Sequence, residues 1–331
     1  MIYLVVGICA VLFVGATYTY QRARNISALY QPDGKTAVID GRSLHYHYFP
    51  AAEVRAEHPV LVFLHGASGN AYDSMLAFKD ELLGQYSLLF LDRPGLGFSD
   101  RNLIEHKTPE GQARLIARLL ELLGIQDAIA IGHSLGAAVT ADLGLVAPKR
   151  VKGLVFIAPA THPWPGGVKW YYSVASWPII GNLFCWTITL PVAERLAPRA
   201  MDNVFYPNEV PVDYAEQIRL PLLFLPDGFR ANSSDIANLE KHVIRQSPNY
   251  TSLEQPALVI TGTEDTVVWP SIHSEALFRD LPNADLMVFE GAGHMPHHSH
   301  TREICGALER LVARVSDDTS GTSRDTQAEF V

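Results

Sequence analysis

A serine set between two glycines is the residue whose surroundings most clearly suggest chemistry. Residues 129–136 read IAIGHSLG, so Ser134 lies in the pattern Gly132-x-Ser134-x-Gly136. An apolar run ends at Gly132 and a helix-forming run begins at Leu135. This arrangement predicts a sharp strand-to-helix turn that exposes the hydroxyl as a nucleophile. The start of a helix there would also favour developing negative charge.

A serine nucleophile needs a base that takes its proton and a third group that orients the base. Asp265 follows the apolar run 257–260, and His294 follows the apolar run 285–289. Both residues would lie on loops at the carboxyl ends of parallel strands, which is the edge where Ser134 is expected. The chain order serine, aspartate, histidine therefore predicts the catalytic triad Ser134, Asp265 and His294 for acyl transfer.

Neighbouring residues offer alternatives for each role. Glu264 could supply the carboxylate, and Asp265 could be an ordinary turn residue. The glycine-rich loop around His294 favours it as the base, although three more histidines follow it closely. These are His297, His298 and His300. The histidines lack cysteine or carboxylate partners at metal-ligand spacing, so no metal site is predicted, and His133 is expected to point away from the nucleophile and pack structurally.

An acyl-transfer intermediate also needs N–H donors for its oxyanion. The amide of Leu135, directly after the predicted nucleophile, would supply one donor. The loop that follows the apolar run 60–64 reads HGASG at residues 65–69. We predict that the amide of Ala67 in this loop supplies the second donor. The alternative is that the loop is an ordinary glycine-rich strand-to-helix turn.

Short apolar runs predict the strands of the body. Segments 37–39 and 44–49 alternate in polarity around a short turn, which predicts an antiparallel hairpin. The later runs are continuously apolar, which is typical of strands covered on both faces in a parallel sheet. They are residues 59–64, 87–91, 128–131, 151–157, 257–260 and 285–289. Helical patterns at 72–83 and 108–123 lie between them, so we expect an α/β fold with a doubly wound, mostly parallel sheet.

The alternation of predicted strands and helices divides the chain. Strands and helices alternate in residues 36–160 and again in residues 251–315, which indicates one α/β core with an insertion. Residues 161–250 hold most of the tryptophans and are expected to form a helical cap over the carboxyl edge of the sheet, where ligands bind in such folds. Residues 21–35 are predicted to be a polar linker. The polar tail 316–331 is predicted to be disordered.

Residues 1–20 contain no charged side chain. A helix of this length rises about 30 Å, which matches the hydrocarbon thickness of a bilayer. Tyr18 and Tyr20 suit an interfacial position, and Arg22 and Arg24 follow. A cleaved signal peptide is the alternative, but it would need a basic residue before the apolar run. We therefore predict a single transmembrane anchor, with the body on the cytoplasmic side by the positive-inside rule.

Bulk composition excludes some classes of function. The chain has 331 residues, of which 48% are hydrophobic, enough for a large core with an insertion. The formal net charge of −9 gives no excess of basic residues, so nucleic-acid binding is not predicted. The three cysteines, Cys9, Cys185 and Cys305, form neither a zinc pattern nor a disulfide framework.

With these motifs in place, residues 36–314 resemble the α/β-hydrolase fold superfamily. Residues 92–99 (DRPGLGFS) strengthen the match, because they resemble a loop of the branch that holds epoxide hydrolases, haloalkane dehalogenases, haloperoxidases and meta-cleavage product hydrolases. Epoxide hydrolases and dehalogenases carry an aspartate nucleophile, and Ser134 departs from that pattern. The resemblance therefore implies a serine hydrolase of ester, thioester, amide or C–C bonds, with a helical cap and no cofactor.

The aromatic cap, together with Trp269 near the predicted acid, suggests an apolar acyl pocket; the alternative is that these aromatics only pack the cap. With the anchor, the first interpretation favours a lipid-like ester that is cleaved through an acyl-enzyme. A C–C bond hydrolase, an acyltransferase or a perhydrolase would use the same triad. A non-catalytic binding protein on this fold is a further class, but such proteins usually lack a triad member.

Overall fold

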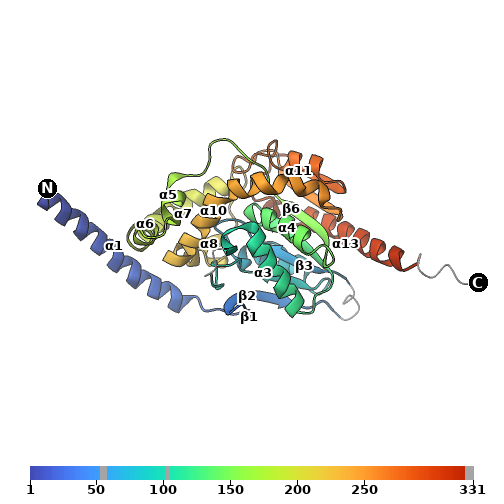
Figure 1. Ribbon diagram of the computed structural model, residues 1–331, viewed down its shortest axis with the longest axis horizontal. Helices are drawn as coiled ribbons and strands as arrows, with labels where there is room; N and C mark the ends of the chain where they lie inside the picture. The colour runs from blue at the N-terminus through green and yellow to red at the C-terminus, as the bar shows by residue number, and fades with distance from the viewer. Residues whose placement is uncertain (53–57, 102–104, 325–331) are drawn as a thin grey trace, which may run out of the picture.

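An eight-stranded sheet forms the centre of the protein (Figure 1). The computed structural model describes residues 1–52, 58–101 and 105–324. The strand order is β1-β2-β4-β3-β5-β6-β7-β8. The pairs β1–β2 and β2–β4 are antiparallel, and all later neighbours in this order are parallel. The strands are β1 (Lys35–Ile39), β2 (Arg42–Phe49), β3 (Val60–Leu64), β4 (Leu88–Leu91), β5 (Ala128–His133), β6 (Val151–Ile157), β7 (Ala257–Gly262) and β8 (Ala284–Phe289). The predicted hairpin and parallel sheet are confirmed.

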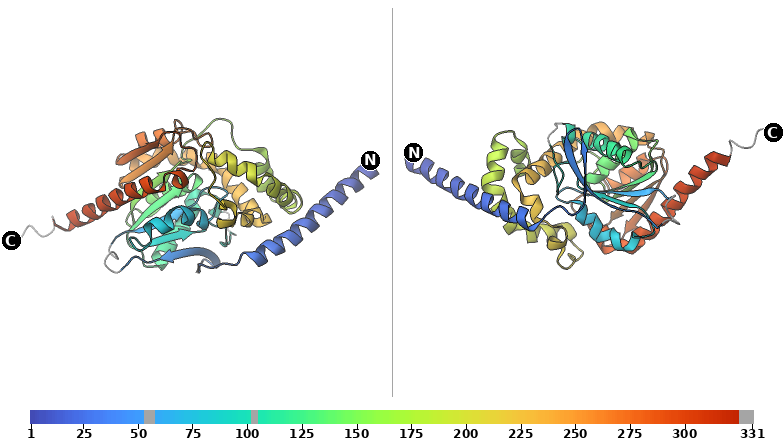
Figure 2. Two further views of the ribbon diagram at one scale, coloured as in Figure 1. Left: turned by 180° about the vertical axis from the view of Figure 1, so that it is seen from behind. Right: turned by 90° about the horizontal axis from the view of Figure 1, so that it is seen from below.

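Helices cover both faces of this sheet. Side chains of β3 alternate between them: Val62 and Leu64 pack toward one group of helices, and Leu61 and Phe63 toward the other. The first group is α3 (Pro109–Leu122), α4 (Leu135–Val146) and α11 (Ser274–Asp280), and the second is α2 (Ala71–Leu82) and α13 (Thr301–Arg324). Figure 2 shows α2 and α13 together in the view from behind. Because both faces are buried, the strands are apolar throughout.

The cap is helical, as the sequence predicts. Its elements are α5 (Trp170–Ser176), α6 (Ile180–Phe184), η3 (Cys185–Thr189), α7 (Leu190–Phe205), α8 (Tyr214–Gln217), α9 (Pro221–Phe224), α10 (Pro226–Gln246) and η4 (Ser247–Ser252). Elements η3, α7 and α9 lie against the first helix of the chain, and α10 runs back toward the sheet (Figure 1).

The two ends of the chain differ from the predicted boundaries. Helix α1 (Ile2–Leu29) continues through residues 21–29, which the sequence analysis assigns to a linker. It continues because Ile26 is buried against cap residues. Helix α13 extends to Arg324, so residues 316–324 of the predicted disordered tail are helical. Residues 325–331 lie outside the described part of the chain.

Among the described residues, α1 is the one single helix long and apolar enough to cross a membrane. Its most apolar 18-residue window has a mean hydropathy of 2.1, and most of that window is exposed. A second candidate appears if α5 and the continuous helix Ile180–Phe205 are taken as one broken span, although they are bent by 115°.

Candidate active site

Ser134 occupies a strained turn between β5 and α4. Its φ of 52° and ψ of −118° are unusual for a residue with a side chain, and its exposure is 8%. The flanking glycines permit this turn. A Cβ at Gly132 would lie 2.3 Å from Thr140 Oγ1, and one at Gly136 would lie 2.2 Å from the carbonyl oxygen of Leu64. The predicted strand-to-helix turn is therefore present, with both glycines required by close packing.

Replacing Gly136 with alanine tests this packing. Gly136→Ala is expected to lower the free energy of unfolding by about 1–3 kcal/mol, because the new methyl group would force the β3 backbone to shift. The matched control is Gly306→Ala in α13, where the nearest atom to a Cβ is Arg310 Nη1 at 3.8 Å. That change should stabilise the helix by up to about 1 kcal/mol. Thermal unfolding measures both, and equal melting temperatures for the two variants would contradict the prediction.

His294 and Asp265 meet at the carboxyl edge of the sheet, on the loops after β8 and β7. His294 Nδ1 lies 2.8 Å from Asp265 Oδ2, and both side chains are buried. The other oxygen of Asp265 accepts hydrogen bonds from the amides of Val267 and Val268, at 2.9 and 2.8 Å. This carboxylate is thus fixed toward Nδ1, which leaves Nε2 of His294 as the nitrogen able to accept a proton. The structure pairs His294 with Asp265, and the alternative Glu264 makes no such contact.

His133, His297 and His298 are held by hydrogen-bond acceptors close to the predicted site. His133 Nε2 lies 3.0 Å from the carbonyl oxygen of His294, and burial lowers the pKa of His133 well below its ordinary value. His298 Nε2 lies 2.9 Å from Asp73 Oδ1, and His297 Nε2 lies 3.5 Å from the other oxygen of Asp73. These histidines therefore have a carboxylate partner that the sequence pattern did not reveal, because Asp73 lies in α2, more than two hundred residues away.

The loop after β3 packs directly against Ser134. A Cβ at Gly66 would lie 3.1 Å from Ser134 Cβ. Arg93, which is fully buried, holds this loop by donating to the carbonyl oxygens of His65 and Gly66, at 2.9 and 3.0 Å. In the described part of the chain, no hydrogen bond is recorded for the amide of Ala67 or Leu135. Both predicted donors are thus available for a ligand.

Helix α10 of the cap reaches the same loop. Asn232 Oδ1 accepts from the amide of Ser68 at 2.7 Å, and Asn232 Nδ2 donates to the Ser68 hydroxyl at 3.0 Å. Asp235 lies 2.8 Å from Arg93 Nη1. These residues were not predicted from the sequence. Arg93 belongs to the DRPGLGFS motif, which was the one available signal.

Trp269 lies between Asp265 and α11 and is 49% exposed. The carbonyl oxygen of Trp269 accepts hydrogen bonds from the amides of Ile272 and His273, which closes the turn. No contact between the Trp269 side chain and the paired Asp265 and His294 is recorded, so its role in substrate binding stays a prediction.

The geometry is that of a serine at a sharp turn beside a paired histidine and aspartate. A family model described as the alpha/beta hydrolase family matches residues 61–307. The chain belongs to this family. The matched region runs from β3 into α13 and includes the three predicted catalytic residues.

Named relatives of this alpha/beta hydrolase carry out several hydrolytic reactions. A 2-hydroxy-6-oxononadienedioate/2-hydroxy-6-oxononatrienedioate hydrolase of Paraburkholderia phymatum is 30% identical over 274 residues, 78% of this chain and 88% of that protein. A pimeloyl-[acyl-carrier protein] methyl ester esterase of Cronobacter sakazakii is 26% identical, over 78% of this chain and 94% of its own. The crystal structure of the enol-lactonase from Burkholderia xenovorans superposes with a TM-score of 0.66 at 19% identity, over 84% of this chain and 100% of that one. Hydrolase activity is therefore supported, and the bond cleaved differs among the relatives.

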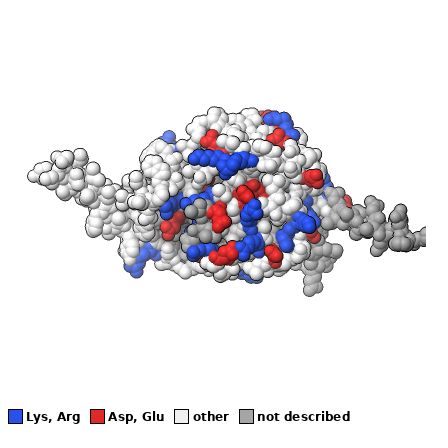
Figure 3. Space-filling view, in the orientation of Figure 1, with Lys and Arg blue, Asp and Glu red and all other residues white. Residues whose placement is uncertain are grey.

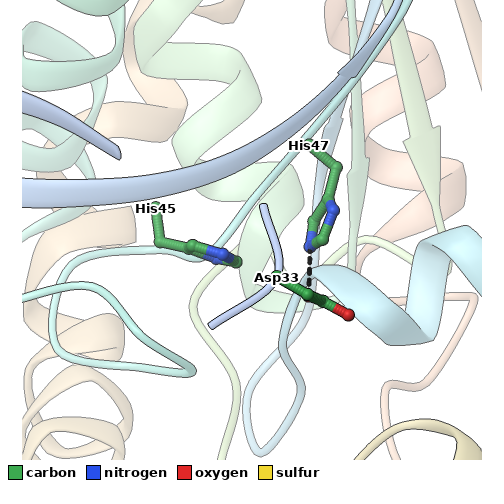
Figure 4. Close-up of side chains that lie close together, drawn as sticks. All are labelled: Asp33, His45 and His47. Carbon is green, nitrogen blue, oxygen red and sulfur yellow. Dashed lines mark ion pairs between the residues drawn. The ribbon is translucent and has the colours of Figure 1, made fainter. Parts of the chain in front are cut away.

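In this alpha/beta hydrolase, two histidines of β2 and an aspartate that precedes the sheet form a group of side chains of the types that bind metals. Figure 4 shows Asp33, His45 and His47 together, with Asp33 Oδ1 3.7 Å from His47 Nε2. His45 already uses both ring nitrogens, since Nδ1 bonds Asp92 and Nε2 accepts from the amide of Gly34. The oxygens of Asp33 are likewise bonded, by Tyr72 and Arg219. We interpret this group as a set of structural contacts that joins the segment after α1 to the sheet and to the cap.

Buried histidines make the stability of this hydrolase depend on pH. Burial, with the nearby Arg93 charge, lowers the pKa of His65 from 6.5 to about 3. The folded state thus favours neutral His65, so its stabilising contribution is complete above pH 6.5 and is lost as the pH falls toward 3. Each such group adds a slope of up to about 1.4 kcal/mol per pH unit. The melting temperature should therefore fall between pH 6.5 and 4.

The His65→Gln variant serves as the control, because glutamine can still accept from the amide of Arg93. Its melting temperature should fall less steeply over this range. Some slope should remain, because burial also lowers the pKa values of His273 and His297 to about 4. An unchanged slope in the variant would contradict the assignment to His65.

Proposed function

We propose that the protein is a serine hydrolase that cleaves an ester bond of an apolar, lipid-like substrate through an acyl-enzyme. Ser134 Oγ attacks the acyl carbon while His294 Nε2 takes its proton. His294 then gives that proton to the leaving alcohol, and water repeats the sequence to release the acid. Asp265 holds His294 in the required tautomer. The observation that carries the proposal is the 2.8 Å contact between His294 and Asp265 beside the strained Ser134 turn.

Two unpaired amides support this mechanism. The N–H groups of Ala67 and Leu135 would donate to the oxyanion, and removing one such donor typically costs about 3 kcal/mol in the barrier. No hydrogen bond between Ser134 Oγ and His294 is recorded among the described residues. In hydrolases this contact often tightens only when substrate binds.

C–C bond hydrolysis is the second candidate, because it is the reaction class of the relative from Paraburkholderia phymatum. The substrates in the name of that relative are dicarboxylates, which require cationic groups for binding. The two buried arginines near the loop after β3, Arg93 and Arg101, both pair with Asp235, at 2.8 and 2.6 Å. The single carboxylate of Asp235 offsets one of these two positive charges. Activity toward a dicarboxylate, compared with activity toward an uncharged ester, distinguishes the two candidates.

The membrane is the proposed location. We propose that α1 anchors the protein as a single-pass helix, with the body on the cytoplasmic side. Support comes from the uncharged residues 1–20 and from Arg22 and Arg24, which follow them.

Labelling with a fluorophosphonate tests the proposed chemistry. The reagent forms a bond from Ser134 Oγ to phosphorus as fluoride leaves, and digestion with mass spectrometry should locate the adduct on Ser134. Chain-length profiling on p-nitrophenyl esters should then show a preference for longer acyl groups. A folded wild-type protein that is neither labelled nor able to cleave these esters would overturn the proposal.

A further inference from the structure

Helix α1 is held along the cap rather than standing free of it. Gly15 permits the approach, since a Cβ there would lie 2.1 Å from the carbonyl oxygen of Thr187 in η3. Further along α1, Tyr18 and Arg22 bind the two carboxylate oxygens of Glu194, at 2.7 and 2.6 Å. Ile26 is buried in a cluster with three cap residues, Leu190, Leu222 and Phe224. The position of α1 therefore fixes the position of this side of the cap.

The contact at Gly15 lies within the segment that would cross the membrane. If the uncharged residues 1–20 fill the hydrocarbon layer, Gly15 is five residues inside its C-terminal boundary. At 1.5 Å per residue, this corresponds to a depth of about 7 Å. Because Thr187 contacts Gly15, η3 must reach a similar depth. Interfacial helices bury their apolar faces by about 5–10 Å, which is the same range.

The cap surface that directly precedes η3 along the chain is suited to lipid. Residues 170–193 contain no Asp, Glu, Lys or Arg, and the stretch is flanked by Lys169 on one side and by Glu194 and Arg195 on the other. Several large apolar side chains within it are exposed, and we call these the cap apolar surface. They are Trp170, Trp177, Ile179, Ile180 and Leu183. Figure 3 shows charged side chains gathered over the body, whereas the projecting part of α1 is free of them on the visible face.

We propose that the cap apolar surface, carried by α5, α6 and the loop between them, is immersed in the same bilayer leaflet from which α1 emerges. This inference rests on the proposed membrane anchor. Exposed apolar patches of this kind are uncommon on soluble proteins, and burial in the acyl-chain region removes them from water. Continuity with α1 specifies a lipid leaflet as the occupant. A membrane-embedded cap would also bring a lipid-like ester to the body without passage through water.

Depth-dependent quenching in vesicles tests the inference on the full chain. Single cysteines would be placed at Val6, Ile180 and Leu122, which are 60%, 56% and 62% exposed. Each would carry an NBD fluorophore in a Cys9→Ala background, since the other native cysteines, Cys185 and Cys305, are buried. The vesicles would contain phosphatidylcholine and phosphatidylglycerol at three to one, with nitroxide-labelled acyl chains as quencher. We expect strong quenching at Val6 in α1 and at Ile180, and none at Leu122 on α3.

The outcomes separate this inference from the proposed anchor. Quenching at Val6 without quenching at Ile180 would overturn the inference and leave the anchor intact. Failure of the chain to float with vesicles, with no quenching at Val6, would overturn the anchor and the inference with it. An Ile180 probe that is shielded by a second copy would remain unquenched in a cross-linkable dimer, which would also overturn the inference.

A functional variant adds an independent readout. Ile179→Asp/Ile180→Asp places two charges on the cap apolar surface and touches no proposed catalytic residue. Activity toward a monoacylglycerol embedded in vesicles should fall at least tenfold, while activity toward soluble p-nitrophenyl acetate should stay within twofold of the wild type. The matched control is Leu122→Asp, for which both activities should be unchanged. Equal loss on the two substrates would contradict the inference.

Discussion

Ser134→Ala is expected to lower kcat for p-nitrophenyl esters by about 10⁴-fold or more, because no other group can form the acyl-enzyme. The substitution removes one oxygen from a turn whose backbone hydrogen bonds involve main-chain atoms alone. The amide of Ser134 donates to the carbonyl oxygen of Ile157, and the carbonyl oxygen of Ser134 accepts from the amide of Ala160. The fold should therefore survive, and fluorophosphonate labelling should disappear with the activity.

The control is Ser252→Ala, which removes an exposed hydroxyl from η4 in the cap. It should retain full activity and full labelling. Melting temperatures of the two variants and the wild type should agree within a few degrees. If Ser134→Ala kept more than a tenth of wild-type activity, Ser134 would not be the nucleophile.

The fold and the meeting of Asp265 with His294 could be predicted from the sequence for one physical reason. Parallel strands bring their carboxyl ends to a single edge, so residues that follow such strands must meet there whatever their separation along the chain. Asp265 and His294 follow β7 and β8, and the structure places their side chains 2.8 Å apart. Continuous apolar runs located these strands because both faces of the sheet are buried.

The residues that hold the loops of the site in place could not be predicted from the sequence in the same way. Asn232 and Asp235 lie on a cap helix, and their partners Ser68 and Arg93 lie on loops of the core. The periodic patterns of helices and strands relate only neighbouring residues, so they cannot connect residues that are separated by more than a hundred positions. The length of α1 was missed for a similar reason, because tertiary packing of Ile26 extends the helix through a polar segment.

The pairing of Asp235 with two buried arginines leads to the second large expected effect. Asp235→Ala should lower the free energy of unfolding by about 3–5 kcal/mol, because it leaves buried cationic charge uncompensated. Arg93 and Arg101 lie 2.8 and 2.6 Å from separate oxygens of Asp235, and the three side chains are almost fully buried. Chemical unfolding in detergent measures the change. The matched control is Lys241→Ala, an exposed position on the same helix, which should change stability by less than about 0.5 kcal/mol.

Substitution of Asp235 should also affect catalysis, because its partner Arg93 holds the loop after β3. Arg93 binds the carbonyl oxygens of His65 and Gly66, so a shift of its guanidinium would move the adjacent amide of Ala67. The milder variant Asp235→Asn keeps the shape of the side chain but removes its charge. It should lower kcat about 10–100-fold, since a displacement of about 1 Å at a catalytic group has this effect, and should change KM for a short ester much less. A loss of stability with unchanged kcat would show that Asp235 compensates charge without positioning the loop.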